Sequence, residues 1–277
     1  MKKLLEIEFY KVKHHKLSRL LFISYFFLLT SIALIAAIKF NIGKNTIYLA
    51  DQGIFNFPYI WHFNTYVADF FTFFLAIIVV SMVTNEFSYR TLKQNLIDGL
   101  SKKEFILSKF YFLVTLSLLA TFFVLVITLI LGYKYSDYTS PGIVFSEIYF
   151  LLAFFLKLLG VFSFIMFLGF LFKRSAFALG FFFVWIIIEG IMYGLIRWQF
   201  FNQKIADTLI SFFPYNSLKN LLPQPVTRLS AAKQIGAQIG ENFGKFEGIP
   251  VQNFFITSLW IIIFVYLSYA ILQKRDL

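Results

Sequence analysis

Six long runs of apolar residues constrain this chain more than any other feature of its sequence. A helix rises about 1.5 Å per residue, so about 20 apolar residues cross a hydrocarbon core of roughly 30 Å. The first, third and sixth runs contain no charged residue. The runs are Leu20–Ile38, Tyr66–Thr84, Phe110–Gly132, Glu147–Phe172, Ala176–Ile196 and Gln252–Leu272. We therefore expect an all-α integral membrane protein with six transmembrane helices in a single domain.

The composition supports a lipid environment. Of the 277 residues, 59% are hydrophobic and 14% are charged, whereas a soluble domain carries about 25% charged residues. The net charge of +11 is compatible with nucleic-acid binding, but apolar runs of this length are foreign to such proteins. Basic residues that orient a membrane protein and meet anionic lipid explain the excess better. We expect membrane lipid, and no nucleic acid, as a partner.

The distribution of Lys and Arg predicts the orientation. With six spans, both termini lie on the same side as residues 85–109 and 173–175. That side carries 15 Lys or Arg in 52 residues, and the other side carries 9 in 96. Because the denser side is cytoplasmic by the positive-inside rule, we expect both termini in the cytoplasm. We expect the first run to be a retained anchor, since its basic lead is long and no small-residue cleavage site follows.

Residues 1–19 have the pattern of an amphipathic helix. Leu5, Phe9 and Val12 fall on one helical face. Positive charge comes from Lys2, Lys3, Lys11, Lys13 and Lys16. This combination favours an elbow helix that lies in the cytoplasmic interface before the first span, and a frayed basic tail is the alternative.

The sequence offers no catalytic or metal-binding motif. It contains no Cys, which removes disulfides, thiolate metal sites and cysteine nucleophiles. It lacks a G-x-x-x-x-G-K-[ST] phosphate loop, H-E-x-x-H and G-x-S-x-G, so we do not expect it to hydrolyse ATP. His14 and His15 are adjacent and point to different helix faces, and His62 stands alone. We therefore expect no catalytic residues, no metal site and no enzyme activity in this chain.

The segment between the second and third runs, residues 85–109, is too long for a simple turn. Leucines recur every four residues, at Leu92, Leu96 and Leu100. Gly99 interrupts this pattern, and Ser101 with Glu104 has the spacing of a capping box. We expect a short amphipathic helix, a break, and a cytoplasmic extension of the third span. The segment is either a lever for a cytoplasmic partner or a solvated connector, and the pattern leaves both open.

The enlarged outer loop, residues 197–251, has a different character. Two short motifs in this loop are typical of turns: PYNS, which begins at Pro214, and LLPQP, which contains Pro223. The stretch Ile205–Phe213 is apolar enough to enter the outer interface. Three glycines at four-residue spacing, Gly236, Gly240 and Gly244, suggest an outer helix or re-entrant cap within Ala231–Phe246.

Three charged residues lie inside the predicted spans. Asp69, Lys157 and Glu189 should each face protein or water, because a central charge costs at least about 2.5–3.5 kcal/mol. We hypothesise that Lys157 pairs with Glu189 or, alternatively, with Asp69. The pair would be a structural clamp or a polar wall of a substrate pathway. Gly190 and Gly194 form a G-x-x-x-G, which favours a tight helix contact or a dimer face.

The order of these elements resembles the membrane subunits of bacterial ABC type-two (ABC-2) exporters along nearly the whole chain. The shared order is an elbow helix, six spans, a long first cytoplasmic loop, a very short second one and an enlarged loop before the last span. The loop after the second span is similar to the family's at Glu86, Thr91, Gly99–Lys102 and Lys109, and the ending LQKRDL resembles the family's basic-Asp-Leu ending. Arg90 stands where the family often has Gly, and Asp98–Gly99 where it often has Pro.

The resemblance implies a permease subunit in the bacterial cytoplasmic membrane, as a homodimer or paired with a related permease. It would dock onto a pair of cytoplasmic ABC ATPase subunits, which would hold the ATP and Mg²⁺, so no cofactor is expected in this chain. The region Glu86–Lys103 would be the main coupling helix, and Lys173–Ser175 a second contact. The implied ATPase-coupling residues are Glu86, Arg90, Thr91, Lys93, Asp98, Leu100, Ser101, Lys102, Lys103, Lys173 and Arg174.

A stand-alone secondary transporter, or a membrane scaffold without an ATPase, is the alternative. Secondary transporters often show inverted repeats and helices broken near the midplane. The sequence shows no convincing internal repeat, and no Pro lies within the predicted spans. The sequence does not identify a substrate or the direction of transport, and a subunit that transmits motion without moving a solute has the same architecture.

Overall fold

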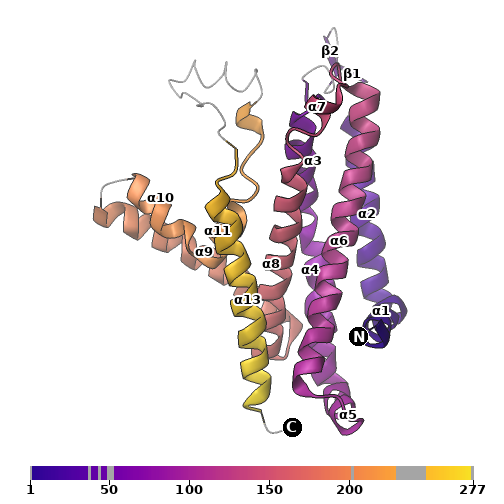
Figure 1. Ribbon diagram of the computed structural model, residues 1–277, viewed down its shortest axis with the longest axis vertical. Helices are drawn as coiled ribbons and strands as arrows, with labels where there is room; N and C mark the ends of the chain where they lie inside the picture. The colour runs from indigo at the N-terminus through magenta and orange to yellow at the C-terminus, as the bar shows by residue number, and fades with distance from the viewer. Residues whose placement is uncertain are drawn as a thin grey trace.

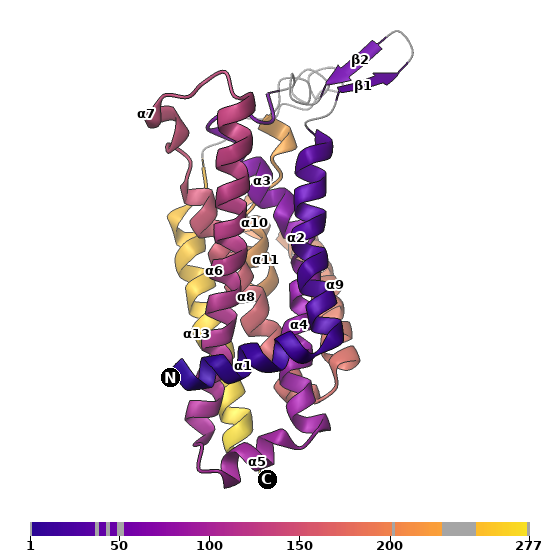
Figure 2. The same ribbon diagram turned by 90° about the vertical axis from the view of Figure 1, so that its right-hand side faces the viewer.

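Long helices run side by side in the protein, and one short helix lies across their end. The computed structural model describes residues 2–36, 39–42, 45–48, 53–200, 203–228 and 248–275. Helix α1 (Lys2–His14) crosses the bundle near the end where α5 (Thr91–Ile97), the turn after α8 (Tyr149–Phe172) and the last turn of α13 (Val251–Gln273) also lie (Figures 1 and 2). We call this end the foot.

Most predicted spans correspond to observed helices. They are α2 (Lys16–Ala36), α6 (Lys102–Tyr135), α8, α9 (Ser175–Phe200) and α13 (Val251–Gln273). Within the described ranges, four segments are long and apolar enough to cross a membrane: α6, Pro141–Phe172, α9 and α13. The pair α3 (Tyr59–Phe70) and α4 (Thr72–Ser88) gives a fifth when counted as one span. The first predicted span, in α2, is not among them, so six crossings stay a prediction.

The second predicted span is not one straight helix, although no Pro lies within it. Helices α3 and α4 meet at an angle of 47°. The Phe71 N–H donates to the Ala68 carbonyl at 3.2 Å, three residues back instead of four. A turn of this tighter kind interrupts the α-helical ladder without any Pro. The bend falls two residues after Asp69.

Helix α8 is the centre of the bundle. It contacts α3, α4, α6, α9, α13 and the short helix α11 (Pro214–Lys219). Lipid tails are as apolar as the side chains, so helices in a membrane associate mainly by close packing at small residues. Two α8 glycines make such contacts: a Cβ on Gly160 would overlap Leu218 of α11, and one on Gly169 would lie 3.0 Å from Val83 of α4.

Helix α9 leans away from the other long helices and leaves most of its surface uncovered (Figure 1). A Cβ on Gly190 or Gly194 would meet no atom within 4 Å. The predicted G-x-x-x-G therefore makes no tight contact within the described part of this chain. Its role as a dimer face stays a prediction.

A short hairpin at the end opposite the foot departs from the all-α expectation. Strands β1 (Lys39–Ile42) and β2 (Asn45–Tyr48) pair antiparallel, with Lys39 opposite Tyr48. Helix α7 (Pro141–Val144) lies at the same end (Figure 2). The sequence gives no strand pattern for this hairpin, because each strand is only four residues long.

The outer loop contains more helix than the sequence suggested. After α9 come α10 (Gln203–Ser211), α11 and the 3₁₀ turn η2 (Val226–Arg228). The prediction of a turn at PYNS is wrong: Pro214 occupies the first position of α11, where its missing N–H has no cost. The segment Ala231–Phe246, with its three glycines, lies outside the described residues.

An ion pair fixes the described part of this loop to the bundle. The Arg228 guanidinium donates to both carboxylate oxygens of Glu147, at 2.6 and 2.8 Å. Arg228 also lies 3.2 Å from Nδ1 of His62, whose Nε2 donates to the Pro223 carbonyl at 2.8 Å. His62, to which the sequence analysis assigned no chemistry, thus helps to hold the outer loop on α3.

The contact between Gly160 and α11 gives a testable prediction about packing. Replacing Gly160 with Val should destabilise the protein by about 1–3 kcal/mol, because the added methyl groups would displace Leu218. The matched control is Gly194→Val, whose side chain would enter open space. Thermal unfolding of both variants in detergent checks this, and equal midpoints would contradict the packing described here.

Candidate functional site

The foot carries the segment that the sequence analysis singled out, and its predicted local structure is confirmed. Helix α5 covers Thr91–Ile97 and is followed by a break at Gly99, whose φ is 96°. Ser101 then caps α6: its side chain accepts from the Glu104 N–H, and the Glu104 carboxylate accepts from the Ser101 N–H. The extension of the third span therefore begins at Lys102.

The corner between α4 and α5 is formed by Arg90, which adopts a left-handed conformation with φ of 57°. A residue with a Cβ pays about 1–2 kcal/mol to adopt this conformation, and glycine does not. The corner is therefore strained, and bonds from neighbouring side chains must hold it.

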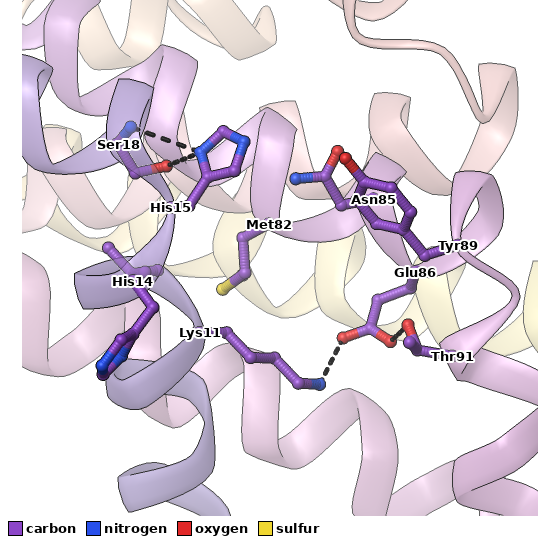
Figure 3. A pocket seen from close by; sticks show the side chains of 10 residues that line it. Lys11, His14, His15, Ser18, Met82, Asn85, Glu86, Tyr89 and Thr91 are labelled. Carbon is purple, nitrogen blue, oxygen red and sulfur yellow. Dashed lines mark hydrogen bonds and ion pairs between the residues drawn. The ribbon is translucent and has the colours of Figure 1, made fainter.

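Glu86 supplies those bonds at the end of α4. Its side chain is 2% exposed, yet its carboxylate accepts three hydrogen bonds. Nζ of Lys109 donates to Oε1 at 2.5 Å, Nζ of Lys11 donates to Oε1 at 2.8 Å, and the Thr91 hydroxyl donates to Oε2 at 2.5 Å. Figure 3 shows Glu86 between Lys11 and Thr91.

Lys109 extends this network to a second carboxylate. Its side chain is 0% exposed, and its Nζ also donates to Oε2 of Glu8 at 2.6 Å. Nζ of Lys11 lies 3.6 Å from Oε1 of Glu8. We call Glu8, Lys11, Glu86, Thr91 and Lys109 the Glu86 cluster. Its two carboxylates and two ammonium groups balance in charge.

The Glu86 cluster joins four helices. Glu8 and Lys11 come from α1, Glu86 from α4, Thr91 from α5 and Lys109 from α6. Burial of a charge is costly unless it is paired and hydrogen-bonded, so no member can leave without exposing another to that cost. The cluster therefore fixes α5 to the elbow and to two long helices.

Lys11 is the most exposed charged member of the cluster, with 35% of its side chain accessible. Burial lowers its pKa, but Glu8 and Glu86 together outweigh this effect and raise the pKa above its ordinary value. Lys11 therefore stays charged throughout the physiological range.

The structure divides the predicted coupling residues into two groups. Glu86 is buried, and Thr91, Leu100 and Lys102 are half-buried. Lys102 donates to the carbonyl oxygens of Gln273 and Arg275, at 3.2 and 2.9 Å. The exposed group is Arg90, Lys93, Asp98, Ser101, Lys103, Lys173 and Arg174. The second group is the one most accessible to a partner, whereas Glu86 is covered by its neighbours within this chain. The coupling role of all these residues stays a prediction.

Sequence reasoning missed the roles of Glu8 and Lys11. The available signal was Glu8 itself, which shares a helical face with Leu5, Phe9 and Val12. A carboxylate on an otherwise apolar face needs a cation across the interface. The partner, Lys109, is about 100 residues away in the chain, and no local pattern identifies it.

Among the charges inside the predicted spans, Lys157 pairs with Asp69. Nζ of Lys157 lies 2.7 Å from Oδ2 of Asp69. This confirms the second of the two pairings considered from the sequence. Because Asp69 lies beside the bend, the ion pair fixes the bent second span to the central helix α8.

The other pairing, between Lys157 and Glu189, is wrong. Glu189 is buried and binds the first turn of α11 instead. It accepts from the backbone N–H groups of Tyr215 and Asn216, both at 2.8 Å, from the Asn216 amide and from the Trp185 indole. Free N–H groups at the start of a helix attract a carboxylate. Sequence reasoning failed because PYNS was taken for a turn.

Comparison with known families identifies one match. A family model described as ABC-2 family transporter protein matches residues 4–189, more than half of the chain. The matched range includes all five members of the Glu86 cluster as well as Asp69, Lys157 and Glu189. No curated protein matches the chain.

Removing the buried cation of the Glu86 cluster should strongly destabilise the protein. Lys109→Met leaves Glu8 and Glu86 with one shared lysine, and we expect the free energy of unfolding to fall by about 3–5 kcal/mol. Denaturant titration in detergent measures this. Adding Glu8→Gln should recover part of the loss, because it removes the excess negative charge. The exposed Lys103→Met on the same helix is the control, and a loss of equal size there would contradict the assignment.

The Asp69–Lys157 pair predicts a reciprocal effect. Lys157→Met and Asp69→Asn should each lower the stability, by about 3 kcal/mol, because each leaves one charge in an apolar environment. The double variant should unfold close to the wild-type midpoint, because a neutral pair has no such cost. Thermal unfolding of the three variants tests this; additive losses in the double variant would show that the two charges do not compensate each other.

Proposed function

The chain belongs to the ABC-2 family of transporter proteins, and from this premise we propose that it is the membrane permease of an ATP-driven transporter. In this proposal the foot faces the cytoplasm and docks onto separate ATPase subunits, which supply ATP hydrolysis. The observation that carries the proposal is the Glu86 cluster, which fixes one short exposed helix to the elbow and to two long helices.

The foot offers a surface suited to such a partner. Seven predicted coupling residues are exposed, and five of them are basic. We call Arg90, Lys93, Asp98, Ser101, Lys103, Lys173 and Arg174 the docking face. Charges of one sign on a contact surface speed association with an oppositely charged partner and set its orientation. The density of Lys and Arg on this side also supports its assignment to the cytoplasm.

The Glu86 cluster explains how motion at the docking face would reach the membrane. A displacement of α5 would move Thr91 and, through its hydrogen bond, Glu86 of α4. Glu86 would in turn move Lys109 of α6, to which it is also bonded. Helix α4 continues through the bend into α3, where Asp69 holds Lys157 of α8. A partner that binds two arrangements of α5 with affinities differing by a few kcal/mol would shift the population of the whole bundle.

The finer features of the proposal follow from the family. We propose six crossings, cytoplasmic termini, a location in the bacterial cytoplasmic membrane, and a dimer with a second copy or a related permease. ATP and Mg²⁺ would bind the ATPase subunits. The bundle would then either export a substrate or transmit ATP-driven motion across the membrane.

Charge reversal on the docking face tests the proposal. The triple variant is Lys93→Glu/Lys103→Glu/Arg174→Glu. We expect the amount of ATPase subunit that copurifies with the tagged chain to fall on the order of tenfold, because each exposed ion pair lost between the two subunits contributes about 0.2–1 kcal/mol. The permease itself should unfold at an unchanged temperature, since none of the three belongs to the Glu86 cluster.

The matched control reverses an exposed lysine at the other end of the same helix. Lys134→Glu, near the end of α6, should leave copurification unchanged. Purification of the wild-type chain without any ATPase subunit would refute the proposal and favour a stand-alone membrane protein. Equal loss with Lys134→Glu would show that the docking face is not the contact surface.

A further inference from the structure

A cavity opens beside the Glu86 cluster, where the elbow turns from α1 into α2. Its volume is about 310 Å³, within the range of small-ligand sites, which begins at roughly 300 Å³. Residues of α1 and α2 form one wall and the ends of α4 and α5 the other. Its polar lining includes Lys11, His15, Ser18, Asn85 and Tyr89 (Figure 3).

Hydrogen bonds around His15 determine which ring nitrogen carries its proton. Nδ1 of His15 lies 3.3 Å from the Ser18 backbone N–H, which can only donate. Nδ1 is therefore the acceptor, and it also bonds the Ser18 hydroxyl at 2.9 Å. In the neutral ring the proton must then sit on Nε2. His15 thus carries an N–H donor on the side of the ring away from Ser18.

The other polar groups of the cavity can also donate. Lys11 has three N–H donors, one of which binds Glu86 at 2.8 Å. The Asn85 amide and the Tyr89 hydroxyl lie on the opposite wall (Figure 3). An imidazole N–H, an amide and a phenol line one part of this cavity, and the Lys11 ammonium lines it beside Glu86 (Figure 3). Such donors suit an anion with several oxygens.

The charges around the cavity favour such an anion. Among the described residues that line the cavity, Glu86 is the only acidic one, and within the Glu86 cluster Lys109 and Lys11 balance the charges of Glu86 and Glu8. Lys13, Lys16 and Arg19 are exposed and alternate in the sequence with lining residues. The nearest exposed acid on α1 is Glu6, so the elbow keeps an excess of positive charge.

The surroundings of the cavity indicate where the anion comes from. Next to the cations, the elbow exposes large apolar side chains: Ile7 and Tyr10 on α1, and Leu17 and Leu20 on α2, each at least 49% accessible. Helix α1 lies across the long helices near the foot, and α4, α6 and α13 extend past it toward α5 (Figure 2). Cations beside exposed apolar residues on such a helix match the boundary between headgroups and acyl chains.

We propose that this cavity binds the phosphodiester headgroup of an anionic phospholipid of the cytoplasmic leaflet. Lys11, His15, Asn85 and Tyr89 donate to the phosphate oxygens, and the acyl chains lie along the exposed apolar residues of the elbow. Lys11 then contacts both the lipid and Glu86. If the proposed function holds, a phosphate that shares Lys11 with Glu86 adjusts how firmly α1 is attached to α4, next to the Thr91 contact that holds α5.

Native mass spectrometry of the full chain in neutral detergent tests the binding, without any ATPase. The probes are phosphatidylglycerol, phosphatidylcholine and inorganic phosphate. We expect phosphatidylglycerol to bind at least about tenfold more tightly than the other two. Lys11→Met should weaken its binding about tenfold, and His15→Leu, which leaves the Glu86 cluster intact, roughly threefold or more. The control Lys16→Met removes an exposed elbow cation outside the cavity and should change the affinity less than about twofold.

Each contrary result overturns the proposal. Equal affinity for phosphatidylcholine would show that the negative headgroup is not recognised, and equal affinity for inorganic phosphate would assign the cavity to a free anion. A loss with Lys16→Met as large as with His15→Leu would indicate diffuse surface charge instead of a site. If Lys11→Met does not fold, His15→Leu alone decides. Because the assay contains no ATPase, failure of the proposed function leaves this result unaffected.

Discussion

A buried carboxylate at the end of α4 is the interaction on which the foot of this protein depends. Glu86 and Lys109 are almost completely inaccessible to water, and neither charge is tolerable there without the other. Their partners come from four helices, so the arrangement of those helices is fixed by electrostatics as well as by packing. This matters in a membrane protein, because hydrocarbon gives packed helices no hydrophobic drive to associate.

The same requirement recurs higher in the bundle. Lys157 of α8 cannot remain alone among apolar side chains, and Asp69 meets it beside the bend in the second span. Glu189 of α9 satisfies the free N–H groups of α11. Each charged residue inside the bundle thus joins two helices that are separate in sequence. Together with the Glu86 cluster, these contacts form a continuous connection from α5 through α4 and α3 to the central helix.

The sequence predicted the parts of this structure that depend on local patterns. Runs of apolar residues located five of the long helices, and the Ser101–Glu104 spacing located the start of α6 to the residue, because a capping box is a contact between near neighbours. The bend at Phe71 was not predictable, since no Pro or Gly marks it. For Lys157 the sequence left two possible partners, Asp69 and Glu189. The role of Glu8 was not predicted, because ion pairs between distant segments leave no periodic signal. The strands of the hairpin are too short to give a recognisable sequence pattern.

The corner at Arg90 shows how the contacts of Glu86 support the segment that we propose to couple the chain to an ATPase. A left-handed residue with a Cβ has no intrinsic preference for its conformation, so the backbone alone would not hold α5 at its observed angle to α4. The next residue, Thr91, donates to Glu86 and thereby ties the first turn of α5 to the last turn of α4. Glycine would relieve the strain at this position, but it would remove a cation from the docking face. The chain keeps that charge on the surface, and the buried carboxylate beneath it maintains the corner that displays it.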